Sequence, residues 1–69
     1  LKGYEKDLSK SIECYLNAGQ KGNSMAFSRI GFIYEKEPSL RDYQKSLEYY
    51  QKGAQGGDIG ALRRIAELY

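Results

Sequence analysis

The chain has 69 residues, of which 41% are hydrophobic and 29% are charged, and its formal net charge is +2. This length supports one small hydrophobic core and excludes a second domain, and no apolar run approaches the ~20 residues that a membrane span needs. The eleven Lys and Arg residues are interspersed with nine acidic residues. No basic stripe results, so nucleic acid is not expected as a partner.

The residue types that common active sites need are scarce. The sequence has no His and a single Cys, which excludes His-based triads, His-based metal sites and a zinc site built from cysteines. Glu13 and Glu48 occupy matching places and could form an acid–base pair. However, Lys10 and Lys52 stand three and four residues from them, which is the spacing of ion pairs on a helix surface. We therefore expect no enzyme activity, no cofactor and no metal.

The first predicted helix covers about residues 7–21. Its apolar residues recur at steps of four, three and four, which places them on one helical face. They are Leu8, Ile12, Tyr15 and Gly19. Cys14 cannot form an internal disulfide, and its place beside Tyr15 predicts a buried, inert thiol. Gly22 can adopt positive φ at the helix end, and Asn23 can cap the next helix.

The second predicted helix covers about residues 23–36 and has a broad apolar face. This face comprises Ala26, Phe27, Ile30, Ile33 and Tyr34. Pro38 restricts the backbone of Glu37 and ends the helix near Lys36. Either Ser39 or Asp42 is then expected to cap the third helix.

The third and fourth predicted helices, about residues 40–56 and 58–69, repeat this pattern. The third helix carries Tyr43, Leu47, Tyr50 and Ala54 on one face, and the fourth carries Ala61, Leu62, Ile65, Leu68 and Tyr69. Gly57-Asp58 repeats the helix-ending role of Gly22-Asn23. Of the seven tyrosines, we assign Tyr15, Tyr34, Tyr50 and Tyr69 to the core. Tyr4, Tyr43 and Tyr49 are less determined, and one of them could anchor a partner.

Aligning the sequence with itself at an offset of 35 residues reveals a tandem repeat. Eleven of the 28 residues from 7 to 34 are identical to their counterparts in 42–69. The identical positions in the first copy are Asp7, Lys10, Ser11, Glu13, Tyr15, Gln20, Gly22, Ala26, Arg29, Ile30 and Tyr34. A period of this length is typical of helical and other repeat architectures.

These residues resemble the Sel1-like repeat, a relative of the tetratricopeptide repeat. The first copy follows its pattern at Lys10-Ser11, Cys14-Tyr15, Asn17-Ala18-Gly19-Gln20, Gly22, Ala26 and Ile30-Gly31 to Tyr34. The second follows it at Lys45-Ser46, Tyr49-Tyr50, Lys52-Gly53-Ala54-Gln55, Gly57, Ala61 and Ile65-Ala66 to Tyr69. Residues 3–7 look like the closing loop of an earlier copy. The departures are serines in place of the first alanine, a short loop around Pro38, and Ala66 in place of a glycine.

The resemblance implies an all-α fold, namely an α–α superhelix (solenoid) of two helix-turn-helix repeats with four antiparallel helices. A single domain would span residues 1–69, with repeat one at about 7–41 and repeat two at about 42–69, and would be part of a longer repeat protein. Only two copies are present where three are normally needed for a continuous core, so we expect marginal stability.

The resemblance further implies a protein-interaction module, an adaptor or scaffold that binds a partner segment on the concave face formed by the first helix of each repeat. The candidate partner-binding residues are Lys10, Glu13, Asn17, Lys45, Glu48 and Lys52. The alternatives are a hydrolase-like or cell-wall-related role, proposed for some bacterial members of the family, and a purely structural spacer. We expect neither nucleic-acid binding nor membrane insertion, but self-association through the open repeat ends. The residues give no indication of the cellular compartment.

Overall fold

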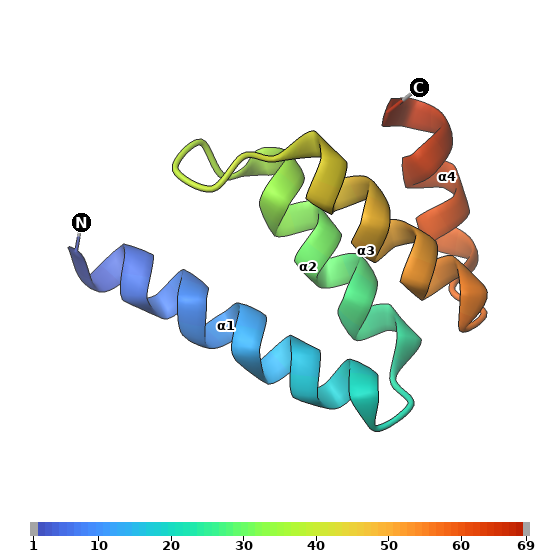
Figure 1. Ribbon diagram of the computed structural model, residues 1–69, viewed down its shortest axis with the longest axis horizontal. Helices are drawn as coiled ribbons and strands as arrows, with labels where there is room; N and C mark the ends of the chain where they lie inside the picture. The colour runs from blue at the N-terminus through green and yellow to red at the C-terminus, as the bar shows by residue number, and fades with distance from the viewer. Residues whose placement is uncertain (1, 69) are drawn as a thin grey trace.

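Four α-helices follow one another between residues 2 and 68, and no strand occurs in that range (Figure 1). They are α1 (Lys2–Gln20), α2 (Ser24–Lys36), α3 (Tyr43–Gln55) and α4 (Ile59–Leu68). The structure, a computed structural model, describes the backbone of residues 2–68 and the side chains of residues 7–68. The expected all-α class is confirmed. None of the described helices combines the length and apolar character that crossing a membrane requires.

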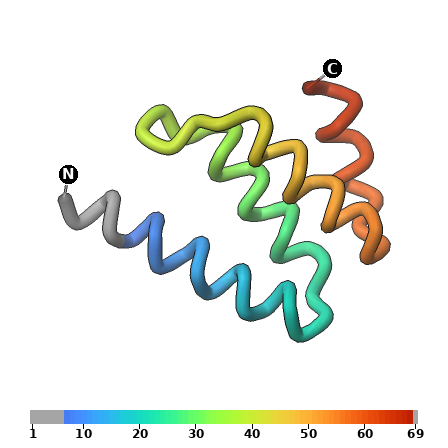
Figure 2. Tube along the Cα trace, viewed as in Figure 1, coloured from blue at the N-terminus to red at the C-terminus, as the bar shows by residue number. Residues whose placement is uncertain are grey.

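The helices lie side by side in chain order, and consecutive helices run in opposite directions (Figures 1 and 2). α2 and α3 form the most extensive contact, α1 packs on α2, and α4 packs on α3 with a smaller contact to α2. The principal extents of the Cα trace are 34 × 28 × 14 Å. The packed helices therefore form a flat layer that is less than half as thick as it is long, with α1 and α4 at its two edges.

The turns after α1 and α3 have the same backbone geometry. Gly22 and Gly57 have φ of 109° and 105°, a region that favours glycine. The amide of Asn23 donates to the carbonyl of Ala18 at 3.0 Å, and the amide of Asp58 donates to the carbonyl of Gly53 at 3.0 Å. Both helices thus end in a Schellman motif, as the two glycines predicted.

Two helix starts and one helix cap differ from the predictions. α1 begins at Lys2, so residues 3–7 belong to this helix and do not form a loop. α3 begins at Tyr43 instead of residue 40, because the Asp42 side chain is the cap and accepts from the amide of Lys45 at 3.1 Å. Asn23 occupies the cap position of α2, but its side chain makes no capping hydrogen bond.

The core lies mainly between α2 and α3. Ile30 and Ser46 are 0% exposed and Tyr50 is 1% exposed, and Ala26 and Ala61 are also buried. The Ser46 hydroxyl donates to the Gly31 carbonyl at 2.8 Å, which satisfies a polar group at the centre of the core. These burials confirm the predicted core places of Ala26, Ile30, Tyr50 and Ala61. Tyr15 and Tyr34 are only half-buried, and the side chains of Tyr4 and Tyr69 lie outside the described residues.

Glycines allow the helices to approach closely. A Cβ at Gly31 would lie 2.9 Å from Cδ1 of Tyr50 and 3.0 Å from the carbonyl oxygen of Ser46. A Cβ at Gly19 would lie 2.6 Å from the ring of Phe27, and one at Gly53 would meet the hydroxyl of Ser28. Gly19 and Gly53 therefore lie where the paired helices come closest.

Cys14 is exposed, so the prediction of a buried thiol is wrong. Its counterpart in the second copy, Tyr49, packs against rings of α2, the helix that precedes it in the chain. No helix among residues 2–68 precedes α1, so the corresponding side of α1 is uncovered. The apolar pattern identified a packing face correctly, but burial also requires a neighbour on that face.

Candidate functional site

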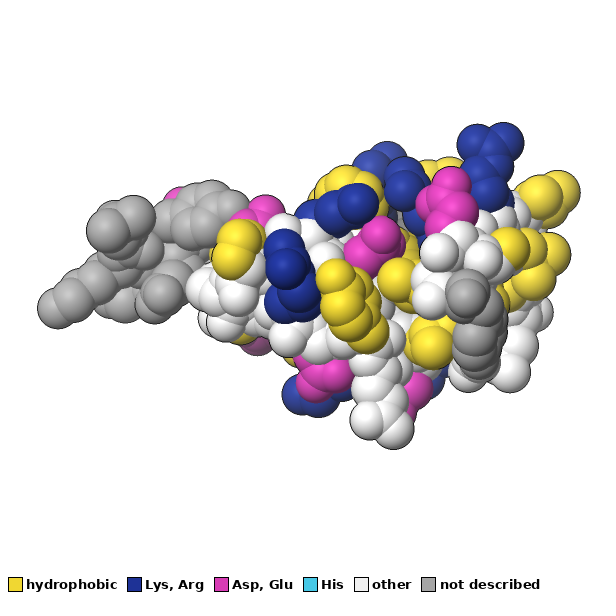
Figure 3. All heavy atoms as spheres, turned by 90° about the horizontal axis from the view of Figure 1, so that it is seen from above, with side chains coloured by type: hydrophobic (Ala, Val, Ile, Leu, Met, Phe, Trp, Pro, Cys, Tyr) yellow, Lys and Arg dark blue, Asp and Glu magenta, His cyan; other side chains and the backbone are white. Residues whose placement is uncertain are grey.

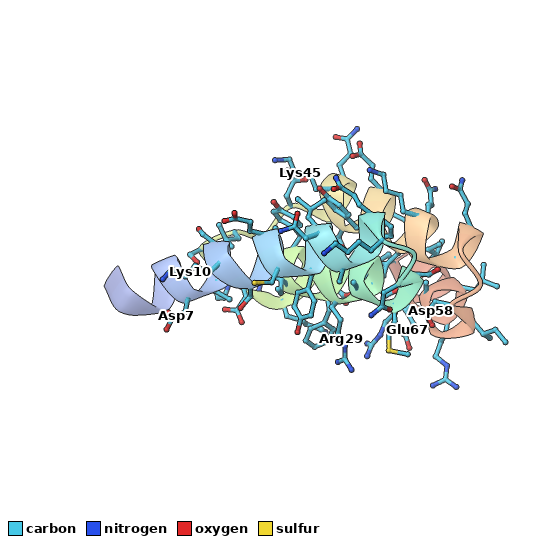
Figure 4. All side chains as sticks on the ribbon, turned by 90° about the horizontal axis from the view of Figure 1, so that it is seen from below. Asp7, Lys10, Arg29, Lys45, Asp58 and Glu67 are labelled. Carbon is cyan, nitrogen blue, oxygen red and sulfur yellow. The ribbon has the colours of Figure 1, made fainter. Side chains whose placement is uncertain are left out.

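The six residues predicted to bind a partner are all exposed, but they form two separate groups. Lys10, Glu13 and Asn17 lie on α1, whereas Lys45, Glu48 and Lys52 lie on α3. α1 and α3 do not pack on each other, because α2 lies between them (Figure 1). Figure 4 shows Lys10 and Lys45 well apart. The structure therefore does not bring the matching residues of the two copies into contact.

The α3 group borders a row of three aromatic rings. The Phe27 and Tyr49 ring centroids are 6.4 Å apart with an interplanar angle of 24°, and those of Tyr34 and Tyr49 are 5.9 Å apart at 12°. These separations are within the range of favourable ring pairs. All three side chains are half-buried. The rings of α2 and α3 thus form a continuous strip that remains partly open to solvent.

A lysine lies over each end of this strip. The Lys52 ammonium is 5.8 Å from the Phe27 centroid and 5.2 Å from the Tyr49 centroid, and the Lys45 ammonium is 5.5 Å from the Tyr34 centroid. These distances allow cation–π attraction. We call Phe27, Tyr34, Lys45, Tyr49 and Lys52 the aromatic–lysine row.

The row follows from helix periodicity on two helices. Lys45, Tyr49 and Lys52 are spaced i, i+4 and i+7, so they share one side of α3. Phe27 and Tyr34 are spaced i and i+7, so they share one side of α2. The glycine-mediated contact between α2 and α3 brings the two sides together.

Lys45 and Lys52 have no ion-pair partner among residues 7–68, where the pairs formed are Glu35–Lys36 at 3.4 Å and Arg64–Glu67 at 3.6 Å. Because the two ammonium groups lie over ring faces and form no ion pair with these residues, they can attract a carboxylate of a partner. The row thus combines apolar rings with positive charge and is chemically suited to a segment that carries acidic and apolar side chains. Figure 3 shows that on the face it draws, hydrophobic side chains are interspersed with side chains of both charges.

A groove of about 310 Å³ lies between α2 and α4, on the opposite side of α2 from Phe27 and Tyr34. It is lined by Met25, Ser28, Arg29, Phe32, Tyr50, Asp58, Gly60 and Arg64. The Arg64 guanidinium lies 5.2 Å from the Phe32 ring centroid and also pairs with Glu67. In this part of the molecule, Figure 4 shows Arg29 and Asp58.

Tyr50 is the buried titratable group next to this groove. Its hydroxyl donates to Oε1 of Glu35 at 2.7 Å. The pKa of Tyr50 lies well above its usual range. Burial is the largest cause, and the hydrogen bond to Glu35 and its negative charge raise the pKa further. The phenol therefore remains neutral, and the hydrogen bond that it donates links α3 to α2.

The lysines of the row were predicted from the sequence, but the row itself was not. Phe27 was placed on the apolar face of the second predicted helix, Tyr34 was assigned to the core, and Tyr49 was left open as a possible anchor. The spacing of seven residues between Phe27 and Tyr34, and between Lys45 and Lys52, could have indicated that each pair shares one side of its helix. The pairing of Tyr49 with rings of α2 could not have been predicted in this way, because it depends on the close approach of two helices from different copies of the repeat.

Comparison of the chain with protein-family models, with curated proteins and with solved structures finds no match in any of the three.

Proposed function

We propose that the chain is a protein-interaction module of the Sel1-like kind, which binds an acidic segment of a partner protein along the aromatic–lysine row. The observation that carries the proposal is the placement of Lys45 and Lys52 over the two ends of a half-buried aromatic strip. The module acts as an adaptor or scaffold and has no catalytic role.

The repeat part of the proposal is supported by matched local geometry. The α1–α2 and α3–α4 turns have equivalent glycines at positive φ and equivalent backbone hydrogen bonds at an offset of 35 residues. In a solenoid arrangement, such units stack so that each contacts only its neighbours and the stack presents an extended surface.

The binding part is supported by burial and charge. Apolar side chains of a partner would complete the burial of three rings that are now half-buried, and aromatic residues of this kind are frequent anchors at interfaces. Carboxylates of the partner would meet the two unpaired ammonium groups, which favours acidic partners and makes association sensitive to salt. Glu48, which lies between the two lysines in the sequence, would repel a carboxylate and help to fix the position of the segment.

Titration calorimetry with two synthetic peptides tests this function. One peptide alternates Glu with Leu, and its counterpart alternates Lys with Leu. We expect the acidic peptide to bind and the basic peptide not to bind. The double variant Lys45→Glu/Lys52→Glu should raise the Kd of the acidic peptide at least tenfold, which corresponds to about 1.4 kcal/mol.

The matched control is Lys21→Glu/Arg63→Glu, which changes the net charge equally at two exposed basic residues that belong neither to the row nor to the predicted partner-binding set. Its Kd should remain close to that of the unmodified chain. Equal losses in the two double variants would show that only overall charge matters and would refute a site at the row. Binding of the basic peptide in preference to the acidic one would refute the acidic specificity.

A further inference from the structure

The α2–α3 interface shows how one copy of the repeat packs on the next. On α3, Ser46 and Tyr50 are 0% and 1% exposed, and their hydroxyls donate to the Gly31 carbonyl and to Glu35 of α2. Tyr49 stacks between two rings of α2. The α3 side of this interface is therefore a serine, a tyrosine and an aromatic ring, and the α2 side has Ile30 and Gly31 at its centre.

The same residue types recur on α1 without a helix to cover them. At an offset of 35 residues, Ser11 corresponds to Ser46, Tyr15 to Tyr50 and Cys14 to Tyr49. Ser11 and Tyr15 are only half-buried, and Cys14 is exposed. We call Ser11, Cys14 and Tyr15 the α1 outer face.

α4 carries the other half of the interface, also uncovered. Ile65 corresponds to Ile30, Ala66 to Gly31 and Leu62 to Phe27. Ile30 is fully buried, but Ile65 is only half-buried, Ala66 is exposed, and Leu62 is 57% exposed. We call Leu62, Ile65 and Ala66 the α4 outer face. Ile59, one turn earlier on α4, is 79% exposed.

We propose that these two faces bind each other between molecules, so that α1 of one copy packs on α4 of a second copy as α3 packs on α2 within one chain. The occupant of each face is a second copy of this chain, because the α2–α3 interface already shows these two kinds of surface in contact. α1 and α4, the helices that carry these faces, lie at opposite edges of the layer (Figures 1 and 2). Both can be occupied at once, and a head-to-tail contact between different faces extends into an open chain of molecules.

The fit is looser than in the α2–α3 interface at two positions. Ala66 stands where α2 has Gly31, and Ala18 stands where α3 has Gly53. A Cβ at Gly31 would lie 2.9 Å from the Tyr50 ring, so the methyl group of Ala66 holds the incoming α1 further away. The contact between molecules is accordingly weaker than the contact within the chain, and the association is reversible.

Sedimentation equilibrium of the 69-residue chain under reducing conditions, from micromolar to millimolar concentration, tests the proposal. Cys14→Lys disrupts the α1 outer face and Leu62→Lys disrupts the α4 outer face, and both positions are exposed. We expect the unmodified chain to exceed the mass of a dimer at high concentration. Each single variant should raise the Kd of association at least tenfold. The matched control is Met25→Lys, a similar change at a side chain that is 55% exposed and lies outside both faces, and it should associate normally.

Mixing the two disrupted variants gives the decisive result. Cys14→Lys retains an intact α4 face and Leu62→Lys retains an intact α1 face, so the mixture should form dimers that contain one molecule of each and grow no further. A symmetric contact between two α4 faces would instead leave Cys14→Lys able to dimerise and the mixture without mixed dimers. That result, or a chain that remains monomeric at millimolar concentration, would overturn the proposal.

Ala66→Gly tests whether the contact follows the α2–α3 geometry. The substitution weakens α4 as a helix and removes apolar surface, so non-specific association should decrease. If α1 approaches α4 as α3 approaches α2, removal of the methyl group should lower the Kd instead, by about threefold or more. An unchanged or higher Kd, in a variant whose circular dichroism remains helical, would refute this geometry. Peptide binding at the aromatic–lysine row is a separate measurement, so failure of this inference leaves the proposed function untouched.

Discussion

Tyr50 joins the core to a carboxylate and thereby makes stability depend on pH. The raised pKa of its buried hydroxyl means that the folded chain keeps the phenol neutral where the unfolded chain would ionise it, above about pH 10. The contribution of Tyr50 to stability is therefore fully present below about pH 10 and is lost as the pH rises through the folded pKa.

We expect the free energy of unfolding, measured by urea denaturation across alkaline pH, to fall more steeply above about pH 10 for the unmodified chain than for Tyr50→Phe. Near neutral pH, Tyr50→Phe should itself cost about 1 kcal/mol, because the hydrogen bond to Glu35 is lost. Tyr43→Phe, at a side chain that is 54% exposed, is the control and should retain the original pH dependence. Parallel curves for Tyr50→Phe and the unmodified chain would contradict the linkage.

Cys14 reports directly on whether the α1 outer face is covered. In dilute solution, the native thiol should react with a thiol reagent at a rate close to that of the denatured chain, because it is exposed. If copies associate through this face, the rate should fall as protein concentration rises. The rate constant for labelling across a concentration series provides the measurement. Strong protection at nanomolar concentration would show that the thiol is covered within one chain.

At the scale of elements, the turns are the part of the fold that the sequence predicted best. Gly22-Asn23 and Gly57-Asp58 each predicted a helix end with positive φ, and both ends occur where expected. This success has a local cause, because a Schellman motif depends on a few consecutive residues.

The start of α3 was placed less well, because both Ser39 and Asp42 have side chains that can cap a helix. The choice between them depended on where the chain passes the end of α2. There the Asp42 amide donates to the Tyr34 carbonyl at 2.9 Å, a contact that no local pattern encodes. The same limit explains the missed aromatic strip and the wrong burial of Cys14, since both depend on which helix lies next to which.

A backbone test at Gly22 follows from its φ of 109° and from the open space around it. In a synthetic chain, L-alanine at position 22 should lower the free energy of unfolding by about 1–2 kcal/mol, because its Cβ disfavours positive φ. The Cβ of L-alanine would meet no neighbouring atom within 4 Å, so steric contact does not contribute to this loss. D-alanine favours positive φ, so it should preserve or increase stability. Equal losses for the two enantiomers, measured by denaturant unfolding, would contradict a conformational origin.

At the scale of the whole molecule, the thin layer leaves little fully buried surface. Among the side chains of residues 7–68, the large ones that are completely buried are Tyr50 and Ile30, with Ser46 beside them. We therefore expect a chain of 69 residues with so small a core to have only modest stability as a monomer. Burial of the two edges by other molecules would therefore add substantially to the free energy of unfolding.

We expect the midpoint of thermal unfolding, followed by circular dichroism, to rise with protein concentration, since association stabilises only the folded chain. The spectrum should be helical throughout the concentration series. Leu62→Lys should remove the dependence on concentration while leaving the midpoint in dilute solution nearly unchanged, because the side chain is 57% exposed. A monomer that melts cooperatively above about 90 °C would contradict the expected modest stability.

The buried contact between α2 and α3 also has a consequence for how the chain folds. The repeat unit read from the sequence pairs α1 with α2 and α3 with α4, but most of the buried side chains lie between α2 and α3, on either side of the boundary between copies. We therefore expect the cooperative unit of folding to be offset from the unit of repetition. Amide protons in α2 and α3 should exchange only on global unfolding, whereas α1 and α4 open independently. Cleavage between residues 41 and 42 would separate the two repeats and divide the buried core between α2 and α3.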